Sequence, residues 1–268
     1  GVTSGVLRDH GGNILVNIFS GPAVNAARGV AVQLNGAVQG FVSNFMTAVN
    51  PQITKSYACG DREYMFALMR RSSRMSFYLL LVLALPVIFN AEYILGLWLK
   101  DVPGHSAMFV RLFLVFALSE SLSSPLITGM LATGRIRNYQ IVVGGLQLLN
   151  LPVSYIFLKA GCMPEVTVIV AIVLSQVCLF ARLVMLGGMT GFPVGTYIRS
   201  VWLNVILVAF SACVIPALLH GRLGGGFWGF VLSAAVCFLC ACVSVLCAGC
   251  SGDERRWIWN VVRKGGKA

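Results

Sequence analysis

The sequence predicts an all-α integral membrane protein with about eight transmembrane helices. Of the 268 residues, 57% are hydrophobic and only 11% are charged, whereas about 25% of the residues of a soluble domain are charged. The mean hydropathy is +0.83, and several apolar runs approach the roughly 20 residues that a helix needs to cross a bilayer. This composition argues against an ordinary soluble domain and predicts a multi-pass membrane protein.

Eight apolar runs, taken in chain order, are the candidate spans. They cover residues 5–20, 23–49, 76–98, 105–132, 138–159, 164–187, 197–219 and 226–249. The first run is interrupted by polar residues and is the weakest candidate. Turn-forming residues separate the runs, for example at Ser20-Gly21-Pro22 and Thr133-Gly134-Arg135. Pro86, Pro125 and Pro152 lie inside runs, where proline is expected to kink a helix.

The basic residues predict the side of the membrane on which each terminus lies. If the first residue is cytoplasmic, only five of the 20 Lys and Arg residues fall on the opposite side, namely Arg28, Lys100, Arg111, Lys159 and Arg222. Cytoplasmic loops are enriched in Lys and Arg, so we predict that both termini of this segment are cytoplasmic. The net charge of +11 then reflects topology, and no nucleic-acid partner is predicted because the basic residues lie between apolar runs.

The two ends of the chain carry further expectations. Residues 251–268 form a basic tail with Trp257 and Trp259, which is typical of an amphipathic segment on the anionic inner surface of a membrane. The first residue is Gly1, and no secretory signal peptide precedes the first apolar run. We therefore expect the chain to be a fragment whose natural N-terminus lies upstream.

The second run contains more polar residues than lipid can solvate. On a helix with about 100° per residue, its polar side chains fall within one arc of about 120°. The members of this arc are Asn25, Arg28, Asn35, Gln39, Ser43, Thr47, Asn50 and Thr54. The opposite face is apolar and includes Val30, Leu34, Phe41 and Phe45. The pattern predicts an amphipathic helix whose polar side faces the protein interior.

Two interpretations of this polar arc are open. Small and polar residues can join helices by close approach and interhelical hydrogen bonds, but one or two residues suffice for that. We favour a water-filled substrate cavity, because an arginine at membrane depth is costly and usually faces a cavity or a partner. An alternative places Arg28 near the membrane edge with its side chain reaching outward. The predicted cavity residues are Asn25, Arg28, Asn35, Gln39, Ser43, Thr47 and Asn50.

Further polar residues lie inside other runs. Glu120 is either a proton or ion carrier in coupled transport or a structural group that bonds or pairs with a neighbour. Gln140, Gln147 and Asn150 share one helical face and are candidates for a second cavity face. Arg182 lies five residues from a predicted cytoplasmic helix end, so we expect its side chain to reach out to the membrane surface.

The chain lacks the motifs of a catalyst. The CxxC pairs Cys237/Cys240 and Cys247/Cys250 lie in an apolar helix with no histidine nearby, so we interpret these cysteines as small buried hydrophobes rather than zinc ligands. The histidines are far apart, and the glycine-rich stretch 221–226 follows no strand. We predict no metal site, no cofactor and no enzymatic activity.

Several stretches are similar to a known family. They are "NIFSGPAVNAARGVAVQLNGAVQGFVSNFMTAVNPQITKSYACGD" (17–61), "ILGLWLKDVPGHSAMFVRLFL" (94–114), "SSPLITGMLATGRIRNYQIVVGGLQLLNLPVSYIFLKAG" (123–161) and "LFARLVML" (179–186). They resemble the C-terminal half of Wzx-type polysaccharide or O-antigen flippases, which belong to the multidrug/oligosaccharidyl-lipid/polysaccharide (MATE-like) exporter superfamily. The resemblance covers most of residues 10–190.

The resemblance implies a fold and a function. Residues 1–190 would form the second six-helix lobe of a MATE-like transporter, residues 191–250 two additional transmembrane helices, and residues 251–268 a basic cytoplasmic tail. The implied function is to flip an undecaprenyl-diphosphate-linked oligosaccharide across the bacterial inner membrane for lipopolysaccharide assembly, by ion-coupled antiport. Arg28 would be a cavity cation, while Asn25, Asn35, Gln39 and Asn50 would meet sugar hydroxyls. The fragment alone is expected to be inactive, because half a cavity does not alternate access.

The resemblance also implies partners and leaves alternatives. The expected partners are the lipid-linked oligosaccharide, membrane lipid, the missing N-terminal lobe of the same protein and a polysaccharide polymerase. One alternative is a multidrug exporter of the same fold, which would favour an aromatic and acidic cavity. Another is a non-transporting membrane scaffold for glycan enzymes, which would need no cavity arginine.

Overall fold

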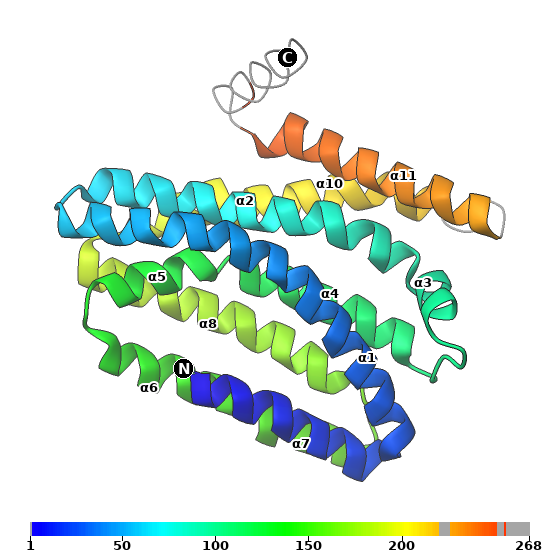
Figure 1. Ribbon diagram of the computed structural model, residues 1–268. Coiled ribbons are helices and arrows are strands. Elements are labelled where there is room, and N and C mark those ends of the chain that lie inside the picture. Colours follow the sequence, from blue (N-terminus) through cyan, green and yellow to red (C-terminus); the bar gives the residue numbers. More distant parts are fainter. Residues whose placement is uncertain (1, 220–225, 251–254, 256–268) are drawn as a thin grey trace.

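The computed structural model describes residues 2–219, 226–250 and 255, and the elements of this part of the chain are all helical (Figure 1). In chain order they are α1 (Val2–Ala58), α2 (Arg62–Phe89), α3 (Ala91–Trp98), α4 (Ser106–Ser121), α5 (Ser124–Ala132), α6 (Ile136–Leu148), α7 (Asn150–Lys159), α8 (Val166–Thr190), α9 (Val194–Tyr197), the π-helix η1 (Ile198–Trp202), α10 (Leu203–Leu219), α11 (Phe227–Ser244) and the π-helix η2 (Val245–Gly249). The predicted amphipathic tail 251–268 lies outside the described residues, apart from Arg255.

Six helical segments are long and apolar enough to cross a membrane by length and composition. They are Arg62–Phe89, Ser106–Ala132, Ile136–Lys159, Val166–Thr190, Val194–Leu219 and Phe227–Gly249. The predicted all-α multi-pass architecture is therefore confirmed, with six of about eight expected spans meeting this criterion. The first two predicted spans, 5–20 and 23–49, are helical parts of α1 but are not among the six. Their asparagines, glutamines and arginines lower the hydropathy of that helix.

Helix α1 is bent at Gly21, where φ is 83° and ψ is 174°. This backbone region is essentially restricted to glycine, and Pro22 follows directly. Residues 2–20 lie beside α6 and α7, while residues 22–58 turn back and run along α2 and α4 (Figure 1). The predicted break at Ser20-Gly21-Pro22 is thus where the chain reverses.

The helix boundaries around the third predicted span differ from the prediction, and the run 76–98 is itself divided at Asn90 between α2 and α3. The second part of α1 continues through Pro51 to Ala58 instead of ending at residue 49, and α2 begins at Arg62 instead of residue 76. Asp61 is the N-cap of α2: its side chain accepts a hydrogen bond from the backbone N–H of Tyr64 at 3.1 Å. The helix therefore extends beyond the apolar run into a basic stretch, which hydropathy alone assigns to a loop.

The span 106–132 is interrupted before Pro125, where α4 ends at Ser121 and α5 begins at Ser124. Proline has no N–H to donate to the carbonyl four residues earlier. The carbonyl that Pro125 cannot bond belongs to Ser121, and the next carbonyl, that of Leu122, accepts hydrogen bonds from Ser73 Oγ and Tyr197 Oη, each at 3.1 Å. As a result, α2 and α9 are both bonded to this break.

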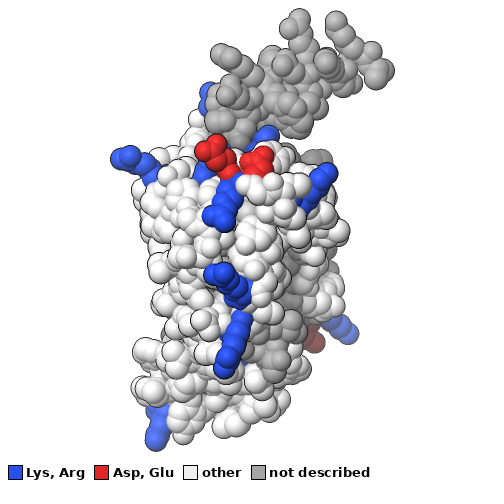
Figure 2. Space-filling view, turned by 90° about the vertical axis from the view of Figure 1, so that its left-hand side faces the viewer, with Lys and Arg blue, Asp and Glu red and all other residues white. Residues whose placement is uncertain are grey.

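The helices present two differently charged ends. The turns 59–61, 133–135 and 191–193 lie at one end, on the left in Figure 1, and the loops 99–105 and 160–165 lie at the other. Figure 2 looks onto the first end, where Lys and Arg side chains dominate around a few acidic ones. The second end carries a more even mixture, with Glu92, Asp101 and Glu165 beside its basic residues.

We predict that Gly21→Ala lowers the free energy of unfolding by about 1–3 kcal/mol, because alanine is strained in this backbone region. The measurement is thermal unfolding of the detergent-purified protein. Gly36→Ala is the matched control: Gly36 lies in the same helix with no atom within 4 Å of an added Cβ, so it should be neutral or stabilising. Equal stability of Gly21→Ala and wild type would show that alanine is not strained at this position.

Candidate functional site

The polar arc of α1 lies beside the buried face of the helix. That buried face consists of Ala27, Ala31, Val38, Val42, Met46 and Ile53. Of the predicted cavity residues, Ser43 and Thr47 are exposed, Asn25, Asn35, Gln39 and Asn50 are half-buried, and Arg28 is buried. Between Asn35 and Thr47 the helix therefore offers a partly accessible polar strip about 18 Å long, at 1.5 Å per residue, which is half-buried at Asn35 and Gln39 and exposed at Ser43 and Thr47. We call residues 35–47 on this side the polar strip.

Arg28 points into the helix bundle, away from the polar strip. Its residue is only 5% exposed, its Nη1 donates to Asn13 Oδ1, and its guanidinium carbon lies 5.4 Å from the centre of the Phe113 ring. Asn13 comes from the first part of α1, so this bond holds the two parts of the bent helix together. Asn13 was not among the predicted site residues, because its pairing with Arg28 exists only after the chain reverses at Gly21.

Asn50, at the other end of the arc, joins two helices. Its Oδ1 accepts a hydrogen bond from Thr128 Oγ1 of α5 at 2.7 Å. Thr47 and Thr54 each donate to a carbonyl one turn earlier in their own helix. Asn50 thus serves as an interhelical contact between α1 and α5. By contrast, the buried Oδ1 atoms of Asn25 and Asn35 have no hydrogen-bond partner within the described part of the chain.

The predicted second face is divided by the structure. Gln140 and Gln147 are half-buried on α6, whereas Asn150 at the start of α7 is 4% exposed and accepts a hydrogen bond from Ser154 Oγ at 2.8 Å. Asn150 lines a cavity of about 20 Å³ together with Arg28, and neither glutamine does. The fold therefore brings together Arg28 from the predicted cavity residues of α1 and Asn150 from the predicted second face.

Glu120 lies near the end of α4, half-buried. Its Oε1 atom is buried without a hydrogen-bond partner, and no ion pair involves this carboxyl among the described residues. The neighbouring Ser119 hydroxyl is 2.6 Å from Ser175 Oγ and accepts a hydrogen bond from Gln176. Ser119, the residue before Glu120, thus joins α4 to α8 through a polar contact.

Arg182 does not reach the membrane surface, so that expectation is wrong. The residue is 2% exposed, and its Nη1 donates to Ser123 Oγ at 2.7 Å. The reason is that the break between α4 and α5 places a serine hydroxyl within reach of the buried guanidinium. No local pattern around Arg182 signals this partner, which is 59 residues away in the sequence.

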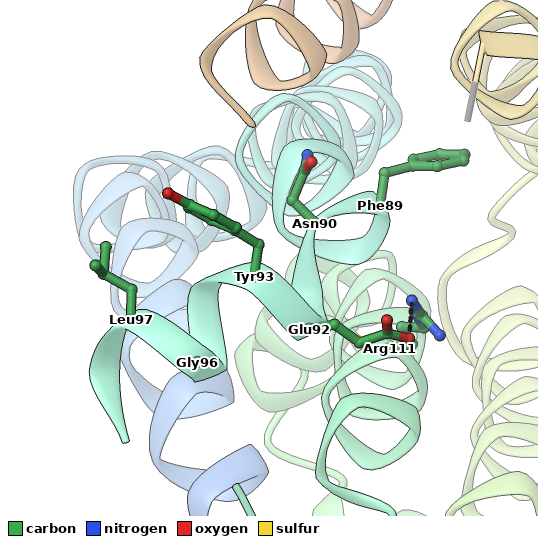
Figure 3. A pocket seen from close by; sticks show the side chains of 7 residues that line it. All are labelled: Phe89, Asn90, Glu92, Tyr93, Gly96, Leu97 and Arg111. Carbon is green, nitrogen blue, oxygen red and sulfur yellow. Dashed lines mark hydrogen bonds and ion pairs between the residues drawn. The ribbon is translucent and has the colours of Figure 1, made fainter. Parts of the chain in front are cut away.

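An open hollow of about 660 Å³ lies beside α3, at the end of the bundle opposite the turns 59–61, 133–135 and 191–193. It is lined by residues of α2, α3 and α4 (Figure 3). Glu92 and Arg111 point toward one another across it, and Arg111 Nη2 donates to Glu92 Oε1 at 3.2 Å. Because this ion pair neutralises both groups, the hollow presents little net charge.

A second, largely apolar cleft of about 420 Å³ lies between α2, α4, α8 and α10. Its lining includes Phe77, Leu81 and Trp202, and its polar lining residues are Ser119 and Gln176. Trp202 Nε1 donates to Gln176 Oε1 at 3.1 Å. No local sequence pattern predicts this cleft, because its walls come from four separate apolar runs.

The helices and their buried polar contacts define an all-α, multi-pass membrane protein. Comparisons of the chain with protein-family models, with curated proteins and with solved structures give no match.

We predict that Ser73→Ala and Tyr197→Phe are coupled. Each single change removes one of two hydrogen bonds to the carbonyl of Leu122 and should cost about 1 kcal/mol of unfolding free energy. The double change leaves that buried carbonyl without either bond, so its cost should exceed the sum by about 0.5 kcal/mol or more. The measurement is a double-mutant cycle from thermal or denaturant unfolding.

The control cycle pairs Tyr197→Phe with Ser56→Ala. The buried Ser56 hydroxyl bonds Ile53 of its own helix at 2.9 Å, and it does not contact the break. The two costs should be additive in this pair. Additivity in the first cycle as well would show that the two hydroxyls do not share the carbonyl.

Proposed function

We propose that the chain is the C-terminal part of a flippase that moves an undecaprenyl-diphosphate-linked oligosaccharide from the inner to the outer leaflet of the bacterial inner membrane. The observation that carries the proposal is the polar strip of α1. Asn35, Gln39, Ser43 and Thr47 follow one another along one side of a helix in a multi-pass membrane protein, half-buried at the first two positions and exposed at the last two. Amide and hydroxyl groups are suitable partners for sugar hydroxyls, which both donate and accept hydrogen bonds.

The polar strip also distinguishes this proposal from its alternatives. A multidrug exporter for cations would require acidic groups, and the strip residues Asn35, Gln39, Ser43 and Thr47 include none. A membrane scaffold would require no accessible polar side chains along a helix, because lipid cannot hydrogen-bond them. In our proposal a second lobe of the same protein covers the strip, and together the two lobes enclose the sugar head group.

The charges at the two ends of the helix bundle indicate which end would face the cytoplasm. The end of the bundle that carries the turns 59–61, 133–135 and 191–193 would face the cytoplasm, because Lys and Arg dominate that end (Figure 2) and cytoplasmic loops are enriched in both. Both ends of the segment would then be cytoplasmic. Arg28 is buried away from the polar strip, so in this arrangement it does not reach a head group lying along Asn35 to Thr47.

We expect Asn35→Leu and Gln39→Leu, introduced into the full-length gene, to abolish surface polysaccharide in a strain that lacks the flippase. Each change replaces an amide by an apolar side chain of similar size, which removes hydrogen bonds to sugar hydroxyls and leaves the volume nearly unchanged. The measurement is complementation, scored by surface polysaccharide on gels at matched protein levels. Phe41→Leu is the control, since Phe41 is an exposed apolar residue of the same helix. Normal polysaccharide in both amide variants would overturn the proposal.

Ion coupling is proposed to involve Glu120, whose buried Oε1 atom has no hydrogen-bond partner among the described residues. In proteoliposomes containing the full-length protein, Glu120→Gln should lose the stimulation of transport by an imposed pH gradient, because an amide does not titrate. Glu92→Gln is the matched control, as Glu92 is exposed and paired with Arg111. Undiminished stimulation in Glu120→Gln would remove this carboxyl from the coupling step.

A further inference from the structure

The side chain of Arg28 carries a buried charge that forms no ion pair with a carboxylate in the described part of the chain. The residue is 5% exposed, and within the part of the chain that the structure describes, no Asp or Glu forms an ion pair with it. A guanidinium remains protonated in proteins. A buried charge requires a partner of opposite sign, because the loss of hydration is costly.

The partners of Arg28 satisfy only some of its hydrogen-bond donors. Asn13 accepts one hydrogen bond from Nη1, and the Phe113 ring covers one face of the guanidinium. Both partners are neutral. The buried Nε atom has no hydrogen-bond acceptor among the described residues.

The cavity beside Arg28 has a net positive lining. It has a volume of about 20 Å³, and its charged lining residues are Arg8, Asp9 and Arg28. Asp9 is already paired with Arg8 at 3.0 Å. The remaining walls contribute Asn150, whose Oδ1 accepts from Ser154, and Thr167, whose hydroxyl donates to the carbonyl of Pro164 at 3.0 Å. The uncompensated charge of the cavity is therefore that of Arg28.

We propose that this cavity binds one small monovalent inorganic anion, such as chloride, against the guanidinium of Arg28. A cavity of about 20 Å³ is comparable with the space that one water molecule occupies. A single small ion fits this volume, whereas a diphosphate does not. The anion neutralises the charge between the two parts of α1 and stabilises the bend at Gly21. This proposal does not depend on the proposed function.

The test is thermal unfolding of the detergent-purified protein in sodium chloride and in sodium gluconate at matched ionic strength. An anion that binds only the folded state raises the unfolding temperature. We expect a saturable increase of roughly 3–5 °C at tenfold the dissociation constant. No difference between chloride and gluconate in the wild-type protein overturns the proposal.

Two variants localise the effect. Arg28→Gln should lose the chloride dependence, and Gly12→Ala should weaken it, because a Cβ at Gly12 would lie 2.9 Å from Nη2 of Arg28 and crowd the cavity. The control Arg111→Gln should keep the full effect, since Arg111 is paired with Glu92 at 3.2 Å outside this cavity. Equal chloride dependence in wild type and Arg28→Gln overturns the assignment.

Two further measurements keep the test decisive if a variant fails to fold. Sodium pyrophosphate at the same ionic strength should not reproduce the effect of chloride on wild type; stronger stabilisation by pyrophosphate would identify a diphosphate site instead. Crystals of the wild-type protein grown in sodium bromide should give an anomalous peak beside the guanidinium of Arg28. A bromide data set without that peak contradicts the proposal.

Discussion

The break between α4 and α5 is the constraint on which the packing of the surrounding helices depends. A membrane interior supplies no water to satisfy a free backbone carbonyl. Pro125 interrupts the helix, and the carbonyl of Leu122 is bonded by Ser73 and Tyr197 while the hydroxyl of Ser123 is bonded by Arg182. Three side chains from α2, α8 and α9 must therefore face one point. This requirement fixes the rotation of each of these helices about its own axis.

The same requirement connects the last two helices to the bundle. The chain continues from α11 into the π-helix η2, which contains the carbonyls of Ala248 and Gly249. Asn204 Nδ2 donates to Ala248 at 2.9 Å, and Tyr78 Oη donates to Gly249 at 3.2 Å. A residue of α10 and a residue of α2 thus complete the end of α11. At η2, as at the break between α4 and α5, polar side chains from neighbouring helices bond backbone carbonyls where the backbone departs from regular α-helix.

The sequence predicted those features that depend on neighbouring residues. Hydropathy located the six spans, and the Ser20-Gly21-Pro22 turn located the bend of α1, because both signals are local. The start of α2 was wrong, since an N-capping aspartate extends a helix beyond its apolar run. The environment of Arg182 was also wrong, and the bond between Arg28 and Asn13 was missed. In both cases the partner of the arginine is brought near by a chain reversal or by another helix, and no pattern within one helix reports it.

The helical arc on α1 gave the direction of its polar side chains but not their environment. At one end Arg28 is bonded inside the bundle, and at the other Asn50 is bonded to Thr128. These contacts hold the helix at two points, and the residues between them remain accessible on their polar side. Lipid cannot satisfy the amides of Asn35 and Gln39, so this side must meet water or a polar surface. The packing of α1 thus separates structural arginine and asparagine side chains from the polar side chains that are free to bind.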